Sequence, residues 1–152
     1  MSPQLTPEYM TEAFDRHSDA EMSCQLDATM DTVAPEPVYE LWPRGLRIAG
    51  RDAVADFYRR QMDAFIPRIV GGERHSAAFG ERVVVFEDSV EISREDGPPL
   101  KLRITSVVEY DEASGLLQGE RLYLDDAFAA IFDDVLGPDF LDVPGVTRVG
   151  AE

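Results

Sequence analysis

Three ionisable residues are the candidates for acid–base chemistry in this sequence: His17, Glu91 and Asp125. A carboxyl group in an apolar environment has a raised pKa, so it can take and return a proton near neutral pH. Asp125 has a suitable position, because it ends an alternating segment and directly precedes a helical one. Asp is also a preferred helix N-cap, so a purely capping role for Asp125 stays open.

Glu91 shares one face of a predicted strand with Glu87 and Ser89. Two facing acids, or an acid beside Arg103 of the next strand, could act as a base and its orienting partner. The other face of the same strand is more apolar and would more naturally turn toward the helices. In that case the Glu91 side chain faces solvent or takes part in a dimer contact, and this alternative stays open.

His17 stands four residues before Glu21 in a helical segment, a spacing that favours an intrahelical contact. Histidine is also the side chain that ordinarily titrates near neutral pH, so His17 is a second candidate for proton transfer. The sequence contains no zinc, calcium-loop or phosphate-loop motif and no G-x-S-x-G elbow. We therefore expect no metal and no cofactor. The single cysteine, Cys24, predicts no disulfide within the chain, and we expect it to be a small buried residue.

The elements that must position these residues are helical in the first part of the chain and extended in the second. A helical pattern covers residues 7–32, with an expected break at 17–19, and another covers residues 50–67. Short strands at 38–42 and 46–49 lie between them. Alternating segments follow at 83–94, 100–110 and 116–125, and a last helix covers 126–136. This order predicts an α+β fold: a cone-shaped, strongly curved antiparallel sheet wrapped around about three helices, with an internal pocket.

The composition suits one domain spanning residues 1–152, with a core at about 7–137 and a loose tail at 138–152. The formal charge of −16 argues against nucleic acid and anionic lipid as partners, and it tolerates neutral or cationic small molecules. Neither a signal-peptide pattern nor a membrane-spanning apolar run is visible. The absence of these two patterns, together with the single cysteine, predicts a cytoplasmic protein.

Four strings carry a family resemblance: YELWP at 39–43, GRDAVADFY at 50–58, ERVVVFE at 81–87 and GERLYLD at 119–125. Together with the order of elements, they resemble the nuclear transport factor 2-like superfamily, and within it the SnoaL-like polyketide cyclase and ketosteroid isomerase-type group. The resemblance covers about residues 7–137. It implies metal-free proton transfer by a pocket aspartate, for which Asp125 is the best positional match. It also implies a first helix that lines the pocket, which favours His17, and a homodimer formed through the sheet face.

The limonene epoxide hydrolases of this superfamily hold a water molecule with an Asp-Arg-Asp arrangement. Asp125 matches one of these acids and Glu91 falls where the other lies, but Ser89 stands where the arginine should be. The resemblance therefore disfavours epoxide hydrolysis for this chain.

We predict a cofactor-free enzyme that transfers protons on a neutral, ring-containing or polyketide-like molecule, in an isomerisation, cyclisation or dehydration. The alternative is a non-catalytic protein of the same fold, which binds a small molecule or serves assembly. Aromatic side chains suit a flat, mostly apolar ligand. The residues expected to line the pocket are Tyr39, Trp42, Tyr58, Phe65 and Tyr123.

Overall fold

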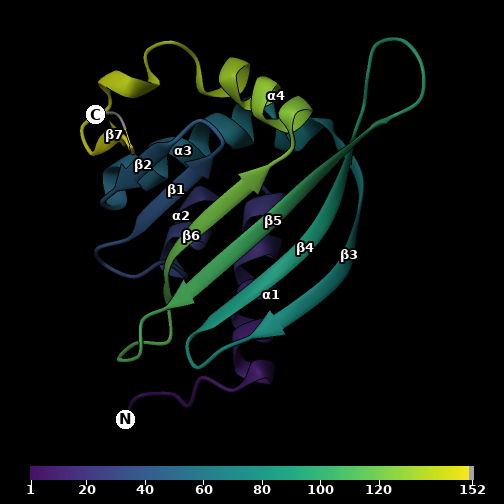
Figure 1. Cartoon of the computed structure of the whole chain (residues 1–152). Coiled ribbons are helices and arrows are strands. Elements are labelled where there is room, and N and C mark those ends of the chain that lie inside the picture. The colour runs from purple at the N-terminus through teal and green to yellow at the C-terminus, as the bar shows by residue number, and fades with distance from the viewer. Residues whose placement is uncertain (151–152) are drawn as a thin grey trace.

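Seven strands form one sheet in the order β3-β4-β5-β6-β1-β2-β7 in the computed structural model, which describes residues 1–150. The strands are β1 (Val38–Trp42), β2 (Leu46–Ala49), β3 (Ile69–Phe79), β4 (Val83–Ile92), β5 (Leu100–Tyr110), β6 (Leu117–Leu124) and β7 (Val146–Arg148). Strand β1 runs parallel to β6, whereas the other neighbouring pairs are antiparallel. The sheet curves around the helices (Figure 1), so the α+β prediction of a curved sheet is confirmed, with one parallel pair added.

Helix α1 (Pro7–Met22) begins where the sequence predicts a helix start. The Thr6 hydroxyl accepts a hydrogen bond from the Tyr9 amide at 3.1 Å, and Pro7 takes the first helical position. The helical segment breaks after residue 22 and not at residues 17–19 as expected. Cys24 adopts a left-handed φ of +53° there, before the short helix α2 (Leu26–Asp31). The expectation of a buried Cys24 is wrong, since this residue is exposed.

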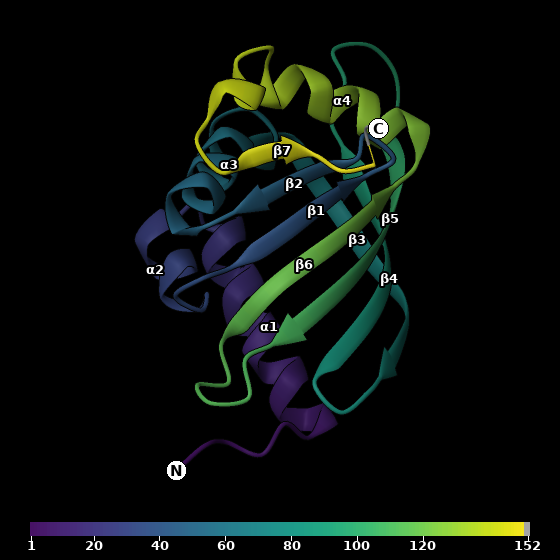
Figure 2. The ribbon, with the colours of Figure 1, turned by 60° about the vertical axis from the view of Figure 1, so that its left-hand side comes forward.

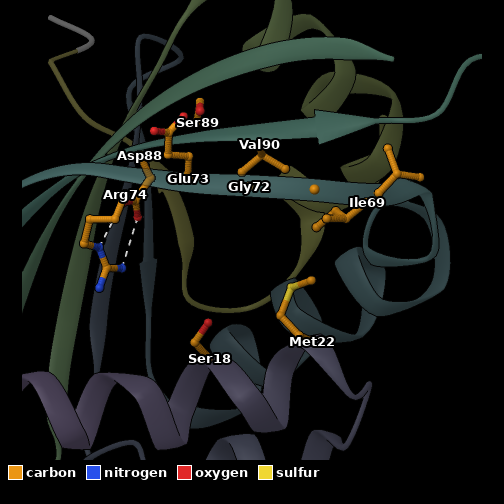
Figure 3. Close-up of a pocket in the computed structure, with 11 residues that line it drawn as sticks. Ser18, Met22, Ile69, Gly72, Glu73, Arg74, Asp88, Ser89 and Val90 are labelled. Atoms are coloured by element: carbon orange, nitrogen blue, oxygen red, sulfur yellow. Dashed lines mark hydrogen bonds and ion pairs between the residues drawn. The ribbon is translucent and has the colours of Figure 1, made fainter. Parts of the chain in front are cut away.

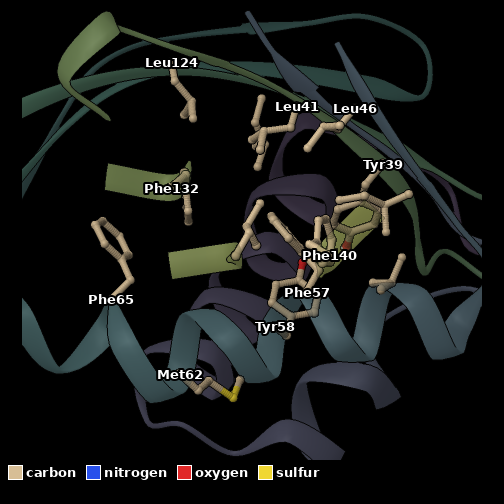
Figure 4. Packing of buried hydrophobic residues seen from close by; sticks show 14 of the residues in the cluster. Tyr39, Leu41, Leu46, Phe57, Tyr58, Met62, Phe65, Leu124, Phe132 and Phe140 are labelled. Atoms are coloured by element: carbon tan, nitrogen blue, oxygen red, sulfur yellow. Dashed lines mark hydrogen bonds between the residues drawn. The ribbon is translucent and has the colours of Figure 1, made fainter. Parts of the chain in front are cut away.

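Helices α1, α2 and α3 (Arg51–Ala64) lie on the concave face of the sheet, and α4 (Asp126–Leu136) lies across one end (Figure 2). The apolar faces of α3 and α4 and the strand residues opposite them form the larger hydrophobic cluster (Figure 4). The rings of Phe65, Phe128 and Phe132 lie 5.0–5.2 Å apart, centroid to centroid. At this end of the cone, aromatic side chains therefore fill the concave space.

A smaller hydrophobic cluster holds α1 against β4 and β5 at the other end of the sheet. Its buried members are Met10, Ala13, Val84, Phe86, Val108, Tyr110 and Leu117. Phe14 of α1 packs on Phe86 with the ring centroids 4.8 Å apart. The His17 ring lies between the two clusters, 6.1 Å from the Phe14 ring and 5.4 Å from the Tyr58 ring.

The C-terminal segment, expected to be loose, carries regular structure over most of its length. Strand β7 pairs antiparallel with β2, and a single 3-10 turn at Phe140–Asp142 precedes it. Phe140 is buried in the larger cluster, with its ring centroid 6.3 Å from that of Phe57. The structure differs from the expectation because one aromatic side chain anchors this short segment.

None of the helices in residues 1–150 combines the length and the apolar character needed to cross a membrane. The cytoplasmic location stays a sequence-based prediction.

Candidate functional site

Five polar side chains meet on the concave side of the sheet, between the two hydrophobic clusters: His17, Glu21, Tyr39, Tyr58 and Glu120. The His17 Nε2 atom lies 2.8 Å from the Tyr58 hydroxyl, 3.4 Å from Glu120 Oε1 and 3.8 Å from Glu21 Oε2. The Tyr58 hydroxyl in turn lies 2.7 Å from the Tyr39 hydroxyl. We refer to these five residues as the polar cluster.

Three parts of the fold bring the polar cluster together. Strands β1 and β6 are parallel neighbours in the register Glu40↔Arg121, which places Tyr39 beside Glu120 on the same face of the sheet. Tyr58 lies on the buried face of α3, and His17 lies on the buried face of α1. The fold thus directs two helices and two strands toward one point.

The hydrogen bonds of Thr32 fix the tautomer of His17. The Thr32 hydroxyl donates to the Thr29 carbonyl at 2.6 Å, so its oxygen accepts the hydrogen bond from His17 Nδ1 at 2.6 Å. Nδ1 therefore carries the proton in the neutral ring. Nε2 is then left as an acceptor that faces the Tyr58 hydroxyl and the Glu120 carboxyl.

Burial shifts the protonation equilibria of the polar cluster away from the charged forms. It lowers the pKa of His17 to about 4 and raises the pKa of Glu21 to about 7. Burial, aided by the negative charge of Glu21, raises the pKa of Glu120 to about 8. At neutral pH, His17 is therefore neutral, Glu120 holds its proton, and Glu21 is close to half-titrated.

Glu21 is the member of the polar cluster with the greatest access to solvent. Its side chain is 23% exposed, against 9% for Glu120 and 0% for His17. Tyr39 and Tyr58 are almost completely buried, and burial raises the pKa of both hydroxyls well above the ordinary value. A molecule arriving from solvent would thus meet Glu21 first.

A pocket of about 520 Å³ opens between α1 and the strands β3 and β4 (Figure 3). Ser18 and Met22 of α1 form one wall, and these two residues flank Glu21 along the helix. The opposite wall comes from the two strands. Its residues are Ile69, Val70, Gly71, Gly72, Glu73, Arg74, Asp88, Ser89 and Val90.

One end of the pocket is formed by an ion pair between Arg74 and Asp88. The guanidinium donates two hydrogen bonds to the carboxylate, at 3.0 and 3.2 Å. The same guanidinium lies over the Phe86 ring, 3.6 Å from its centroid. Arg74 is the one cationic residue among the described residues that line the pocket, and both its charge and its flat face are already engaged.

Asp125, predicted as the catalytic acid, caps helix α4. Its Oδ1 atom accepts a hydrogen bond from the Phe128 amide at 2.8 Å, and its Oδ2 atom accepts one from the Arg103 amide at 2.7 Å. The capping alternative is thus confirmed, with both carboxylate oxygens bound to backbone amides. The catalytic role of Asp125 stays a prediction, and Asp125 lies outside the polar cluster.

Glu91 lies on the face of β4 that turns away from the helices. Val84, Phe86 and Ile92 are buried on the opposite face of this strand, and Glu91 lies between them in the alternation. Glu91 contributes instead to a smaller pocket of about 290 Å³, together with Lys101 of β5. Its catalytic role also stays a prediction, without a partner in the polar cluster.

The five aromatic residues expected to line a pocket have different positions. Tyr39, Tyr58 and Phe65 are buried in the core. Trp42 is half-buried and donates its indole N–H to Glu40 Oε2 at 3.0 Å, and Tyr123 is exposed. None of the five is among the residues that line the 520 Å³ pocket. Tyr39 and Tyr58 join the site through their hydroxyl groups.

Glu120 is the site residue that sequence reasoning missed. A usable signal is present, because Glu120 has the same parity as Leu122 and Leu124 in β6 and so lies on an apolar strand face. An acid at such a position is either paired or has a shifted pKa. Glu21 entered the sequence analysis only as a neighbour of His17. Among residues 1–150 the structure has no group of three His, Cys, Asp or Glu residues placed to hold a metal ion.

No protein-family model matches this sequence, and no curated protein matches it either. Structural similarity is extensive. An NTF-2 like protein of unknown function from Burkholderia xenovorans is 21% identical, with a TM-score of 0.59 over 78% of this chain and 84% of that one. A putative isomerase from Rhodopseudomonas palustris is 18% identical, with a TM-score of 0.63 over 82% of this chain and 96% of that one.

The epoxide hydrolase/cyclase-like enzyme SalBIII, described for pyran ring formation in the polyether salinomycin, is also similar in structure. It is 13% identical, with a TM-score of 0.64 over 79% of this chain and 93% of that one. At these identities the comparisons establish the fold alone. The chain has the nuclear transport factor 2-like fold, as its sequence strings suggested.

Proposed function

We propose that the protein is a cofactor-free enzyme that moves a proton on a neutral, ring-containing molecule held between α1 and β3–β4. The observation that carries this proposal is the polar cluster beside the pocket. In that cluster Glu21, with a pKa raised to about 7, lies 3.8 Å from a neutral His17. A group with a pKa near the working pH is the most effective acid–base catalyst.

In the proposed reaction, the ionised Glu21 carboxylate takes a proton from the carbon next to a carbonyl group. The electron pair of the broken C–H bond forms an enolate, whose oxygen carries the negative charge. The protonated Glu21 then returns this proton. In an isomerisation the proton goes to another carbon; in a cyclisation it goes to the alkoxide formed when the enolate carbon attacks a second carbonyl. In a dehydration it goes to the departing β-hydroxyl, which leaves as water while the enolate collapses to a C=C bond. Such positioned proton transfer contributes roughly 10²–10⁴ in rate.

The buried members of the polar cluster support Glu21 in this proposal. His17 Nε2 lies on the inner side of Glu21, 3.4 Å from the Glu120 carboxyl and 2.8 Å from the Tyr58 hydroxyl. Because Glu120 is kept neutral by burial, it adds little negative charge to the site while Glu21 is ionised. Asp125 and Glu91 have no step in this scheme.

The charges around the pocket favour a neutral substrate. The chain carries a formal charge of −16, and the pocket wall contains Glu73 and Asp88. Arg74 is already paired with Asp88 and offers no free cation to an anionic group. An anionic substrate would therefore be repelled on approach and left without a partner in the pocket.

The test is proton exchange at carbon. Neutral cyclic ketones, with 1-tetralone as the first probe, are incubated with the protein in D₂O, and loss of the α-proton signal is followed by NMR. We expect the protein to accelerate exchange and Glu21→Gln to lower the rate about a hundredfold. The matched control is Glu87→Gln, an exposed residue of β4 on the other sheet face. Equal rates for the wild type and Glu21→Gln, or no acceleration by the wild type, would overturn the proposal.

A second function, binding without catalysis, is favoured by one specific observation. His17, Tyr39 and Tyr58 are almost completely enclosed and all have hydrogen-bond partners, which is also how a structural buried network looks. Saturable binding of the cyclic ketones without any exchange would select this function.

We also infer that two copies of the chain pair through the convex face of the sheet. Val83, Val85 and Val107 are partly exposed there, and Tyr123 is 43% exposed. Together they form an apolar area on β4, β5 and β6 that an association would cover. Light scattering at micromolar concentration tests this inference. We expect twice the mass of 16.9 kDa for the wild type and the monomer mass for Tyr123→Glu. A monomeric wild type contradicts it.

A further inference from the structure

The 520 Å³ pocket between α1 and the strands β3 and β4 has a polar end and an apolar end. At the polar end Arg74 pairs with Asp88, and its guanidinium also lies 5.4 Å from the centroid of the Phe14 ring of α1. Two residues further along β4, Val90 packs against the larger hydrophobic cluster. Met22 lies two turns beyond Phe14 on α1. The helix and the strands therefore pass from polar to apolar in the same direction (Figure 3).

Ser18 lies on the wall of this pocket, between its two ends. It follows Phe14 by one turn of α1 and precedes Met22 by one turn, and it is partly buried. Its hydroxyl oxygen points from α1 toward the strands, and it has no hydrogen bond to any other described residue that lines the pocket (Figure 3). The hydroxyl of Ser89, in contrast, lies 3.0 Å from His75 Nε2. Ser18 thus presents a hydrogen-bond donor that the other lining residues do not use.

Ser18 is also a neighbour of the proposed base, because it stands three residues before Glu21 on α1. Residues at this helical spacing have their Cβ atoms about 5–6 Å apart on one face. Glu21 Oε2 lies 3.8 Å from His17 Nε2, so the carboxylate extends back along α1 toward the turn that holds Ser18. A hydroxyl and a carboxylate placed in this way can contact adjacent atoms of one small molecule. The hydroxyl would contact a carbonyl oxygen, and the carboxylate would contact a hydrogen on the next carbon.

We propose that Ser18 is a specificity-determining residue whose hydroxyl donates a hydrogen bond to a carbonyl oxygen of the bound molecule, while Met22 and Val90 contact its hydrocarbon part. This inference rests on the proposed function and names the two halves that the substrate must have. Because Arg74 is engaged by Asp88, the Ser18 hydroxyl is the donor left for the carbonyl oxygen at this wall. The hydrogen bond strengthens as the enolate forms, since the oxygen then carries negative charge.

The experiment compares two probes that differ in the carbonyl oxygen, 1-tetralone and its parent hydrocarbon tetralin. Binding of each probe is measured by NMR titration for the wild type, Ser18→Ala and Met22→Gln. The matched control is Ser23→Ala, at the exposed C-cap of α1, outside the pocket lining. Ser18→Ala should lose about fivefold in affinity for the ketone and nothing for the hydrocarbon. Met22→Gln should weaken both probes by a similar factor, because it changes the wall against the part that they share. Ser23→Ala should bind both probes as the wild type does.

Two further readouts separate a role in binding from a structural one. At saturating ketone, Ser18→Ala should slow α-proton exchange about tenfold or more, because the lost hydrogen bond is to a charged oxygen in the enolate. Without any probe, Ser18→Ala should unfold at or above the Tm of the wild type, since alanine is the better helix former. A lower Tm would show that the hydroxyl already has a partner in the free protein.

That result overturns the proposal, as does a ratio of ketone affinity to hydrocarbon affinity that is unchanged in Ser18→Ala or falls equally in Ser23→Ala. Met22→Gln with unchanged affinity for both probes overturns the placement of the hydrocarbon part. Ketone binding that depends on Ser18 without any α-proton exchange supports Ser18 and removes the catalytic role of Glu21. Exchange that depends on Glu21 but not on Ser18, with ketone binding also indifferent to Ser18, supports the enzyme and overturns the assignment of Ser18.

Discussion

Replacing Glu120 with glutamine should make the protein more stable at high pH and leave its stability at low pH nearly unchanged. Burial raises the pKa of Glu120 from 4.5 in the unfolded chain to about 8 in the folded protein. Between these two values the folded protein holds a proton that the unfolded chain has released. The free energy of unfolding of the wild type therefore falls as the pH rises from 4.5 to about 8.

The size of the effect follows from the same two pKa values. Each unit of pKa corresponds to 1.36 kcal/mol, so the contribution grows to about 5 kcal/mol once the pH exceeds 8. This figure is an upper limit, because water penetration and local relaxation lessen the cost of a buried charge. Glutamine has nearly the shape of the protonated acid and does not titrate. The Glu120→Gln variant should therefore gain up to about 5 kcal/mol over the wild type at pH 9, and little at pH 4.5.

Urea unfolding at several pH values between 4.5 and 9 measures this difference directly. The matched control is Glu87→Gln, which removes the same charge from an exposed position on β4. Because all three proteins share the repulsion among the remaining acidic residues, that background cancels in the comparison. A Glu120→Gln variant that is less stable than the wild type at every pH, or a difference that does not grow with pH, would refute the assignment of a neutral buried Glu120.

Three further predictions concern other parts of the structure. The pKa of His17 is 6.5 in the unfolded chain and about 4 in the folded protein, so the unfolded chain takes up a proton at a higher pH. The free energy of unfolding should therefore fall by up to about 3 kcal/mol as the pH drops from 6.5 to 4. NMR of the imidazole should still show a neutral His17 at pH 5, and a charged ring there contradicts the assignment. Asp125→Asn should keep proton exchange but lose one of the two backbone hydrogen bonds, because an amide nitrogen cannot accept one. Asp125→Ala, which loses both, should cost more, about 1–2 kcal/mol in urea unfolding. Phe140→Ala should cost about 3–5 kcal/mol, because its ring packs in the core, and a cost below 1 kcal/mol would show that the C-terminal segment is not anchored there.

The sequence is informative about the fold because its periodicities are strong. Alternation over residues 83–94 and 100–110 matches strands β4 and β5 closely, and the hairpin turn lies where Gly97 follows Asp96. The tail is different, since β7 is only three residues long and its position depends on pairing with β2 and on one buried ring, Phe140. No local pattern carries that information.

The candidate site is harder to predict from the sequence than the fold, because its residues come from helices and strands that are far apart in the chain. His17 is identifiable by residue type, but its contacts with Tyr58 and Glu120 join residues 41 and more positions apart. Asp125 shows the opposite difficulty. The same residue type suits a helix cap and a catalytic acid, and the capping role becomes visible only in the two backbone amides bound to its oxygens.

The pH dependence of α-proton exchange tests the central claim most directly. With 1-tetralone in D₂O, the rate should rise as Glu21 loses its proton, reach half its maximum near pH 7, and level off above pH 8. In Glu21→Gln this sigmoidal rise should be absent, whereas Glu87→Gln should show the wild-type profile. A wild-type rate that does not change around pH 7, or the same profile in Glu21→Gln, would contradict the account of Glu21 as the base.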